Sequence, residues 1–526
     1  MGSRAIHWLR ASALRLGDAL LRLPAHRALP LFVALLAAFT LLKLLAIAWS
    51  PLLLSGDEAH YWEWSRRLDW AYYSKGPVVA LLIAAGTALF GDTELGVRFP
   101  AVVLGSLLSV ALFAFAWRLA GAGLAFASVV LLSSGLLFHT LGLGMTTDAP
   151  VLLFWTLATW CAYEALFRGK PVAWLGWGLA LGLATLSKYT AGIVFPAVLL
   201  FLLINPRLRP ALFRPPFWAG TVVYGLCLLP VAWWNLEHGW VNLAHNAGHV
   251  SSGLTDGLRL RYVPELLGAQ LGLVGPVLFP MLVWSCWRAA KAYRHDGDDV
   301  AGLLLAPVVP LALLCVGVAL TKRVYANWPA PLYVNAVLLL AWILARDADL
   351  AYRVRTALGS ALLCNLVLLL PTYPLALGSR MGLPPERLPS KKLIGWDQLG
   401  RYVDGVRTQW AADGRPLSFV TNDRYGILSA ISFYSEDRPP VYCAQIGGRR
   451  MNQYDVWGGW ETQRGNDALI VLSQDAVHPD LANRFRVITP AAPPLEIRYD
   501  GGPLRTFYFF AGLGFDGRPP APPTSY

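Results

Sequence analysis

Residues 30–50 read PLFVALLAAFTLLKLLAIAWS, and this stretch decides the fold class. It is apolar apart from Lys43, and it is long enough to form a helix of the about 20 residues that cross a bilayer. Basic residues precede it, as in a secretion signal, but the run is longer than the roughly 7–15 residues of a signal core. We therefore interpret it as a retained first membrane span.

Ten more apolar stretches follow, and together they predict an α-helical polytopic membrane protein with about eleven transmembrane helices. Only 14% of the residues are charged, whereas soluble domains carry about 25%. The stretches 172–187 and 330–345 are short for a span. The predicted spans are 30–50, 97–117, 122–141, 149–167, 172–187, 189–205, 217–234, 264–287, 301–319, 330–345 and 355–373.

After residue 373 the composition becomes that of a soluble domain. Short strands are expected at 418–421, 468–472 and 505–510, which indicates a small α+β fold. We therefore predict a transmembrane domain over 1–373 and a soluble domain over 374–526. Since that second domain holds a single cysteine, it has no internal disulfide.

The basic connections between the spans alternate regularly, which sets the orientation. They comprise the N-terminus, Arg118, 168–170, 207–214, 288–294 and 346–355. Loops rich in Lys and Arg stay cytoplasmic, so an odd number of spans places the soluble domain outside, which is the periplasm if the cell is Gram-negative. The net charge of +12 is explained by the Lys and Arg residues that membrane topology requires in the cytoplasmic loops. We therefore exclude nucleic acid as a partner.

The loop over 51–96 then lies on the periplasmic side. Its apolar segment 77–90 would form a helix of only about 21 Å, which is too short to cross a core of about 30 Å. We expect an interfacial or re-entrant helix there.

Three carboxylates lie at this outer boundary. Asp57 and Glu58 follow the first span, and Asp148 stands at the entrance of the fourth. Such carboxylates can act as general bases or hold a divalent cation, so a divalent cation is the one cofactor left open. The alternative for Asp148 is helix capping, because it precedes Pro150 at an expected helix start.

Five cations fall on the same side, where the positive-inside rule disfavours them. Snorkelling to lipid phosphates is the alternative explanation, but it accounts less well for their recurrence in separate outer loops. A cation cluster beside a base suits the cleavage of a sugar phosphoester, since it stabilises the leaving phosphate while the base activates an acceptor hydroxyl. The five are Lys75, Arg98, Lys188, Lys322 and Arg323.

The run DEAHYWEWS at 57–65 and the run YSKGP at 73–77 resemble the first outer loop of GT-C glycosyltransferases. The similar branch contains protein O-mannosyltransferases, lipid A aminoarabinose transferases and rhizobial galacturonosyltransferases. The resemblance extends from residue 30 to about residue 335. Weaker matches are LFGD at 89–92, GVRFP at 96–100, TDAP at 147–150, LSKYT at 186–190 and ANWPAP at 326–331.

This resemblance implies an inverting transferase that moves a sugar from undecaprenyl phosphate, or another polyprenyl phosphate, to an envelope acceptor. The acceptor would be lipid A, another glycan or lipid, or a protein. Family members differ in metal use, so the metal stays open. The resemblance implies catalytic roles for Asp57 as the base and for Glu58 and Asp148, which would support the site or help to hold a metal. It implies donor-phosphate binding for Lys75, Lys188 and Arg323. Arg98 and Lys322 are further candidates for the phosphate because of their position, and His60 and Tyr61 are candidates for contact with the acceptor or the sugar.

Two further motifs are candidates for contact with the acceptor or the sugar. His245 and His249 are spaced to share a helix face, and zinc binding is the alternative. In the tail, Asn452, Gln453, Tyr454 and Asp455 mix planar polar and aromatic side chains, and an ordinary loop is the alternative.

A different interpretation of the whole chain is a transporter or flippase for a lipid-linked sugar. Transporters place ionisable residues near the bilayer midplane, whereas here they gather at one face. We therefore expect interfacial chemistry.

Overall fold

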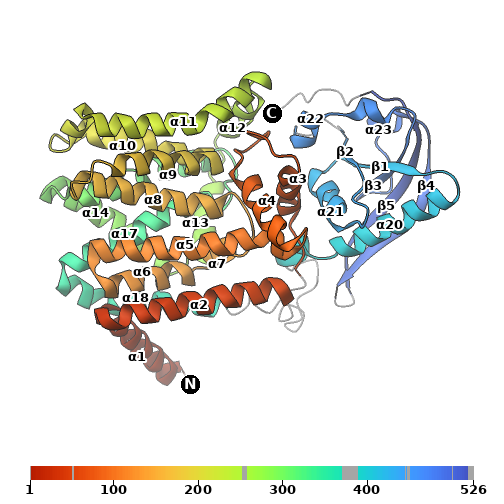
Figure 1. Cartoon of the computed structure of the whole chain (residues 1–526). Helices are drawn as coiled ribbons and strands as arrows, with labels where there is room; N and C mark the ends of the chain where they lie inside the picture. The colour runs from red at the N-terminus through yellow and green to blue at the C-terminus, as the bar shows by residue number, and fades with distance from the viewer. Residues whose placement is uncertain are drawn as a thin grey trace.

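The structure is a computed structural model that describes residues 2–49, 52–251, 257–369, 389–444, 446, 451–499 and 502–518. Figure 1 shows a bundle of helices on the left and a sheet domain on the right, with two helices, α3 and α4, between them. Within the bundle, helices α2, α5, α8, α9 and α11 run side by side along nearly one direction.

The bundle is built from long apolar helices interrupted by short turns. Its elements are α1 (Gly2–Leu21), α2 (Ala25–Trp49), α5 (Glu94–Ala120), α6 (Ala122–Ser134), α7 (Leu136–Leu141), α8 (Asp148–Phe167), α9 (Ala173–Ser187), η1 (Tyr189–Ile193), α10 (Val194–Ile204), η2 (Arg209–Phe213), α11 (Pro215–Glu237), α12 (Val241–Ser251), α13 (Tyr262–Leu273), α14 (Leu278–Lys291), η3 (Ala292–Asp296), α15 (Asp299–Leu305), α16 (Val308–Ala319), α17 (Ala330–Arg346) and α18 (Ala348–Leu369).

Each of the eleven predicted spans corresponds to helix, and the polytopic fold is confirmed. In the described part of the chain, six helices are long and apolar enough to cross a membrane, and a bent pair is a seventh candidate. The predicted span 264–287 is broken in the middle, because α13 and α14 meet at 109°. Gly275, with φ +121°, and Pro276 interrupt the helix there.

The first outer loop forms two short helices at the end of the bundle. Helix α3 (Gly56–Ser65) begins with a capping box between Ser55 and Glu58. Helix α4 (Val78–Phe90) matches the expected short helix and, at 13 residues, has a length of about 20 Å. Both helices separate the bundle from the sheet domain (Figure 1).

The sheet domain has five strands in the order β2-β1-β3-β5-β4. Strand β1 is parallel to β2 and β3, and β5 is antiparallel to β3 and β4. The three predicted strands are confirmed, while the predicted boundary at 373–374 lies outside the described residues. The elements are η5 (Pro389–Leu393), α20 (Trp396–Ala412), β1 (Leu417–Asn422), α21 (Tyr425–Tyr434), β2 (Val441–Cys443), α22 (Gln453–Trp457), η6 (Trp460–Gln463), β3 (Asp467–Leu472), α23 (Pro479–Ala482), β4 (Phe485–Tyr499) and β5 (Gly502–Phe515).

The sheet domain is docked on the first outer loop through specific bonds. The Tyr434 hydroxyl accepts from the backbone N–H of Leu54 at 2.7 Å and donates to Glu94 at 2.9 Å. Arg438 pairs with Asp92. These contacts fix α21 against the start of α3, which is where the candidate site lies.

Candidate active site

The best-defined ion pair lies where α8, α9 and the segment before α17 meet. The Lys188 ammonium donates to Asp148 Oδ1 at 2.7 Å, and the Asn327 amide donates to Asp148 Oδ2 at 2.7 Å. Asp148 and Lys188 are only 2% and 8% exposed. Both oxygens of Asp148 are thus used by side chains, so the structure does not support the capping alternative.

Lys188 reaches Asp148 because helix α9 ends there. Its backbone is extended, with φ −154° and ψ 117°, between α9 and η1. A helical residue at this place would continue the axis of α9, whereas this break turns the side chain aside. The result is an ammonium held inside the bundle beside a carboxylate.

Lys75 approaches the same place from the loop between α3 and α4. The next residue, Gly76, packs on α9 so closely that a Cβ would lie 2.0 Å from the Leu186 carbonyl oxygen. Burial and the nearby Lys188 charge lower the pKa of Lys75 to about 8, while Asp148 and Asp57 oppose this shift. Whether Lys75 carries its positive charge therefore depends on the neighbouring charges and on the pH.

Asp57 stands on the exposed side of α3, in its first turn. Its Oδ1 accepts a hydrogen bond of 2.8 Å from the hydroxyl of Tyr425, the first residue of α21. The two helices approach through glycines, since a Cβ on Gly56 would lie 3.0 Å from Gly426 Cα. Burial and then the Asp57 charge raise the pKa of the Tyr425 phenol, so this hydroxyl remains a donor at neutral pH.

Asp57, Lys75, Asp148 and Lys188 therefore face one region, as the sequence analysis expected. The charges that act on Lys75 are those of the other three. Tyr61 borders the same region, since burial and then Asp57, Tyr425 and Asp148 raise its pKa. An exposed carboxylate beside two ammonium groups can take a proton from a hydroxyl while phosphate charge is stabilised nearby.

Glu58 and Arg98 form a separate buried pair. The guanidinium donates to Glu58 Oε1 at 2.8 Å and to Oε2 at 3.0 Å. Glu58 also accepts from the backbone N–H groups of Ser55 and Met145, at 2.9 and 3.1 Å. Burial raises the pKa of Glu58, but the Arg98 charge and these hydrogen bonds lower it overall.

Arg98 is equally occupied. Besides Glu58, its guanidinium donates to the carbonyl oxygens of Leu52 and Leu53, at 2.9 and 2.8 Å. Arg98, which belongs to α5, therefore links the loop between α2 and α3 to both α3 and α5. Neither Glu58 nor Arg98 is among the charges that act on Lys75.

The two predicted cations after α16 have other surroundings. Arg323 pairs with Glu265 at the start of α13, and both residues are exposed. Lys322 is partly buried, and its backbone N–H donates to Val318. Donor-phosphate binding by Lys322 and Arg323 stays a prediction.

His60 lies on the buried side of α3 and faces the sheet domain. Its Nδ1 lies 3.1 Å from Ser429 Oγ, and its ring packs at 5.2 Å from the Tyr454 ring. Burial lowers the pKa of His60 to about 3, so the ring is neutral. His60 thus joins the two domains.

The tail motif at 452–455 also lies at the contact between the sheet domain and the first outer loop. The Gln453 side-chain oxygen accepts from the Tyr73 backbone N–H at 2.6 Å, and the Tyr454 hydroxyl lies 2.8 Å from Ser429 Oγ. Asn452 and Asp455 form a capping box at the start of α22. Sugar contact by these residues stays a prediction, because the structure shows their contacts within the protein.

One histidine of α12 also borders the first outer loop. His245 Nδ1 lies 3.0 Å from the Tyr73 hydroxyl. The side chain of His249 lies outside the described part of the chain. Among the described residues, no group of three or more His, Cys, Asp or Glu side chains is close enough to hold a metal ion. The zinc alternative, which includes His249, therefore stays a prediction.

The sequence analysis missed two residues of the site, Asn327 and Tyr425. Asn327 lies in the run ANWPAP, which was a weak family match, and its amide holds Asp148. Tyr425 lies 368 positions after Asp57, and no local pattern marks it. A distance constraint between the two domains would have been needed to find it.

The chain is similar to several known proteins. Residues 74–234 match the family model described as dolichyl-phosphate-mannose-protein mannosyltransferase. The lipid A galacturonosyltransferase of Rhizobium johnstonii is 30% identical over 382 residues, which are 71% of this chain and 77% of that protein. An undecaprenyl phosphate-alpha-4-amino-4-deoxy-L-arabinose arabinosyl transferase of Pseudomonas savastanoi is 28% identical, over 58% of this chain and 60% of that protein.

The fold is also that of a solved structure, ArnT from Cupriavidus metallidurans bound to undecaprenyl phosphate. The TM-score is 0.60 at 15% sequence identity, over 93% of this chain and 98% of that chain. The match covers both the bundle and the sheet domain.

Proposed function

Since this chain belongs to the GT-C family of polyprenyl-phosphate-dependent glycosyltransferases, we propose that it transfers a sugar from undecaprenyl phosphate to lipid A in the bacterial envelope. The convergence of Asp57, Lys75, Asp148 and Lys188 carries the proposal, because cleavage of a sugar phosphoester needs a base close to cations that bind the phosphate. Lipid A is the favoured acceptor, since the galacturonosyltransferase relative that acts on it covers most of this chain. Its relatives favour an enzyme over a transporter.

Asp57 is the catalytic base in this proposal. It takes the proton of the acceptor hydroxyl, and the oxygen attacks the anomeric carbon of the sugar. The bond between that carbon and the phosphate oxygen breaks, and its electron pair leaves with the polyprenyl phosphate. Attack opposite the leaving group inverts the anomeric configuration.

Lys75 and Lys188 bind the donor phosphate and stabilise the charge that develops on it. Asp148 does not need to touch the reacting atoms. Its carboxylate holds the Lys188 ammonium and the Asn327 amide at 2.7 Å each, so the cation is positioned before the donor arrives.

Tyr425 marks the place of the acceptor hydroxyl. Its phenol donates to Asp57 at 2.8 Å, which is the contact that an acceptor hydroxyl would make with the base. The acceptor therefore replaces Tyr425 on Asp57 when it binds. The sheet domain thus takes part in acceptor selection.

Glu58 and Arg98 have a positioning role in this proposal instead of the catalytic and phosphate-binding roles first expected. Every oxygen of Glu58 is already used by donors from α5, Ser55 and Met145. Removing Glu58 from this network would leave Arg98 buried and unpaired.

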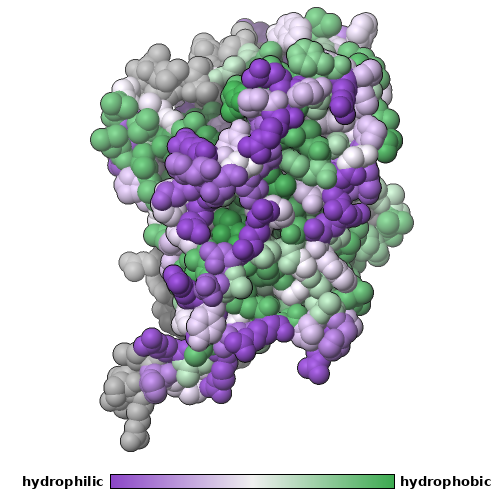
Figure 2. All heavy atoms as spheres, turned by 90° about the vertical axis from the view of Figure 1, so that its left-hand side faces the viewer, coloured by the Kyte–Doolittle hydropathy of each residue, from purple (hydrophilic) through white to green (hydrophobic). Residues whose placement is uncertain are grey.

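The orientation that we propose places the sheet domain and the site in the periplasm. Figure 2 shows the opposite end of the bundle, where hydrophilic side chains cross the helix ends. Predicted cytoplasmic cations meet there, since Arg118 and Lys170 both pair with Glu164, at 3.1 and 2.8 Å. Loops rich in Lys and Arg face the cytoplasm, which supports an inner-membrane enzyme with a cytoplasmic N-terminus.

Mass spectrometry of lipid A from cells with and without the gene tests this function. We expect a mass increment of one sugar that disappears with the gene and returns with the wild-type chain but not with Asp57→Asn. An unchanged lipid A profile, with the increment lost from another envelope glycan or a protein, would overturn the proposed acceptor. No lost increment anywhere would overturn the transferase.

A further inference from the structure

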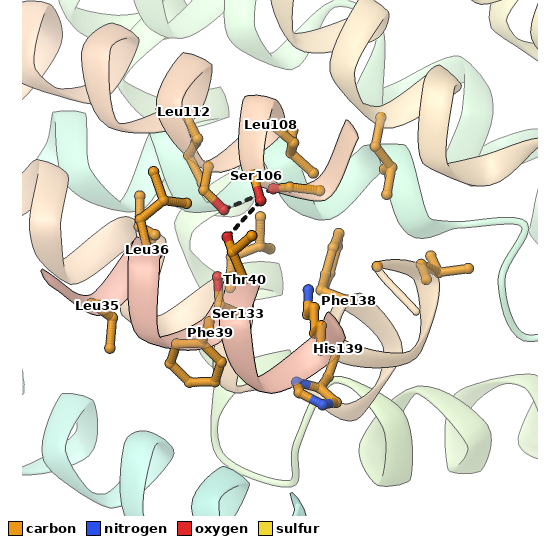
Figure 3. Close-up of a pocket in the computed structure, with 18 of the residues that line it drawn as sticks. Leu35, Leu36, Phe39, Thr40, Ser106, Leu108, Leu112, Ser133, Phe138 and His139 are labelled. Carbon is orange, nitrogen blue, oxygen red and sulfur yellow. Dashed lines mark hydrogen bonds between the residues drawn. The ribbon is translucent and has the colours of Figure 1, made fainter. Parts of the chain in front are cut away.

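A pocket lies within the bundle between α2, α5, α6 and α7, away from the ion pairs described above. We name it the Lys43 pocket, after the one lysine in its lining. Figure 3 shows the hydroxyl groups of Thr40, Ser106 and Ser133 and the ring of His139 facing it, with Leu35, Leu36, Leu108 and Leu112 around them. The pocket is therefore apolar with a polar side.

Lys43 directs its ammonium into the bundle. A Cβ on Gly142 would lie 2.4 Å from Nζ, and a Cβ on Gly105 would lie 3.7 Å from it. The amine thus rests on the backbone of α5 and of the turn after α7. A lysine that snorkels to water or to surrounding lipid would extend away from the helices.

Among the described residues that line the pocket, none is a carboxylate, and the charge of Lys43 acts on the ring of His139. Thr40 and Ser106, whose hydroxyl oxygens lie 2.8 Å apart, add hydroxyl groups but no charge. An ionisable residue at membrane depth is costly without an opposite charge and marks a functional site by default.

The depth of Lys43 suits a lipid headgroup. Helix α2 has 25 residues, which extend about 37 Å, so it exceeds the about 30 Å of a hydrocarbon core. Lys43 lies about 9 Å before the last residue of α2, Trp49. This end of the helix points toward the sheet domain, where outer-leaflet phosphates would lie (Figure 1).

The pocket is distinct from the donor site. Lys43 is not among the charges that act on Lys75 or on Glu58. The turn after α7 separates them: Gly142 touches Lys43, whereas a Cβ on Gly144 would lie 3.5 Å from Glu58 Oε1. A ligand on Lys43 would thus contact the backbone that holds Glu58.

We propose that the Lys43 pocket binds an anionic phospholipid of the outer leaflet. Its phosphate lies on the Lys43 ammonium, and an acyl chain lies along the leucine side chains that line the pocket. The charge of the phosphate complements the lysine, and the hydroxyl groups of Thr40 and Ser106 solvate it. The bound lipid then stabilises the turn at 142–145 and, through it, the Glu58 network.

Thermal unfolding and native mass spectrometry of the full chain in nanodiscs test this site in the absence of donor. We expect phosphatidylglycerol to raise the melting temperature and to stay bound, and phosphatidylcholine to do neither. Lys43→Met should weaken phosphatidylglycerol binding roughly tenfold, because a charged hydrogen bond is lost. It should still fold, since methionine suits a membrane helix.

The matched control is Lys291→Met, which removes an exposed lysine from the far end of α14 and should leave the lipid effect unchanged. Gly142→Ala keeps the charge but fills the place of the ammonium, and it should also weaken binding. An equal lipid effect in wild type and Lys43→Met would overturn the site. Retention of undecaprenyl phosphate in place of phosphatidylglycerol would overturn its ligand.

Discussion

Two neighbouring carboxylates on opposite sides of α3 differ in how many hydrogen bonds they accept. On the buried side, Glu58 accepts from Arg98, Ser55 and Met145. On the exposed side, Asp57 accepts one bond from Tyr425, which belongs to another domain. A carboxylate saturated by fixed donors holds a structure together, whereas one with a single exchangeable partner is available for chemistry.

The difference has a physical basis. A buried charge is tolerated only when a partner charge and hydrogen bonds replace water, and such a charge cannot leave its partners cheaply. Asp57 is exposed, so it can take a proton and release it without disturbing the fold. Variants at the two positions should therefore differ in kind.

The largest effect is expected for Asp57→Asn. The amide cannot take a proton, so kcat should fall on the order of 10^3-fold while the melting temperature stays near that of wild type. Transfer measured with purified enzyme, donor and lipid A would check this. Full activity would show that another group is the base.

Glu58→Gln should instead lower the stability, so that the protein unfolds more easily. It leaves Arg98 buried without its counter-charge, and breaking such a pair costs about 3–5 kcal/mol. Chemical unfolding or thermal melting in detergent measures this loss. A stable variant with a large drop in kcat would return Glu58 to the catalytic role.

The pH dependence tests the cation side of the site. Because the pKa of Lys75 is lowered to about 8, its positive charge is present below that pH and is lost above it. We expect kcat/KM for the donor to fall roughly tenfold per pH unit above about 8.

Lys75→Arg is the matched variant, since arginine stays charged throughout this range. It should flatten the alkaline limb even if its activity at pH 7 is lower. If kcat/KM of Lys75→Arg fell above pH 8 as it does in the wild type, the group that titrates would be a different one.

The smallest effect is expected for Tyr425→Phe. Removing the hydrogen bond from the phenol frees the Asp57 carboxylate for the acceptor, so KM for the acceptor should fall roughly threefold with little change in kcat. Steady-state kinetics with varied lipid A would measure it. A fall in kcat instead would mean that Tyr425 positions the base during the reaction.

The comparison on α3 also shows where sequence analysis ends. Asp57 and Glu58 are adjacent and both acidic, so no local pattern separates the proposed base from the carboxylate that pairs with Arg98. Only the position of Arg98, forty residues later, decides it. The break between α13 and α14 was equally hidden, because apolar length alone does not show a bend of 109°.

The sequence by itself predicted the membrane fold, the small α+β domain and four charged residues that the structure brings together. These follow from local properties: apolar length, alternating charge, and acidic or basic side chains where none is expected. Tertiary structure alone decided which of those charges satisfy one another, because the free energy of a buried charge depends on partners far away in the chain. It also brought Tyr425 onto Asp57 and placed Lys43 in a pocket whose described lining contains no carboxylate.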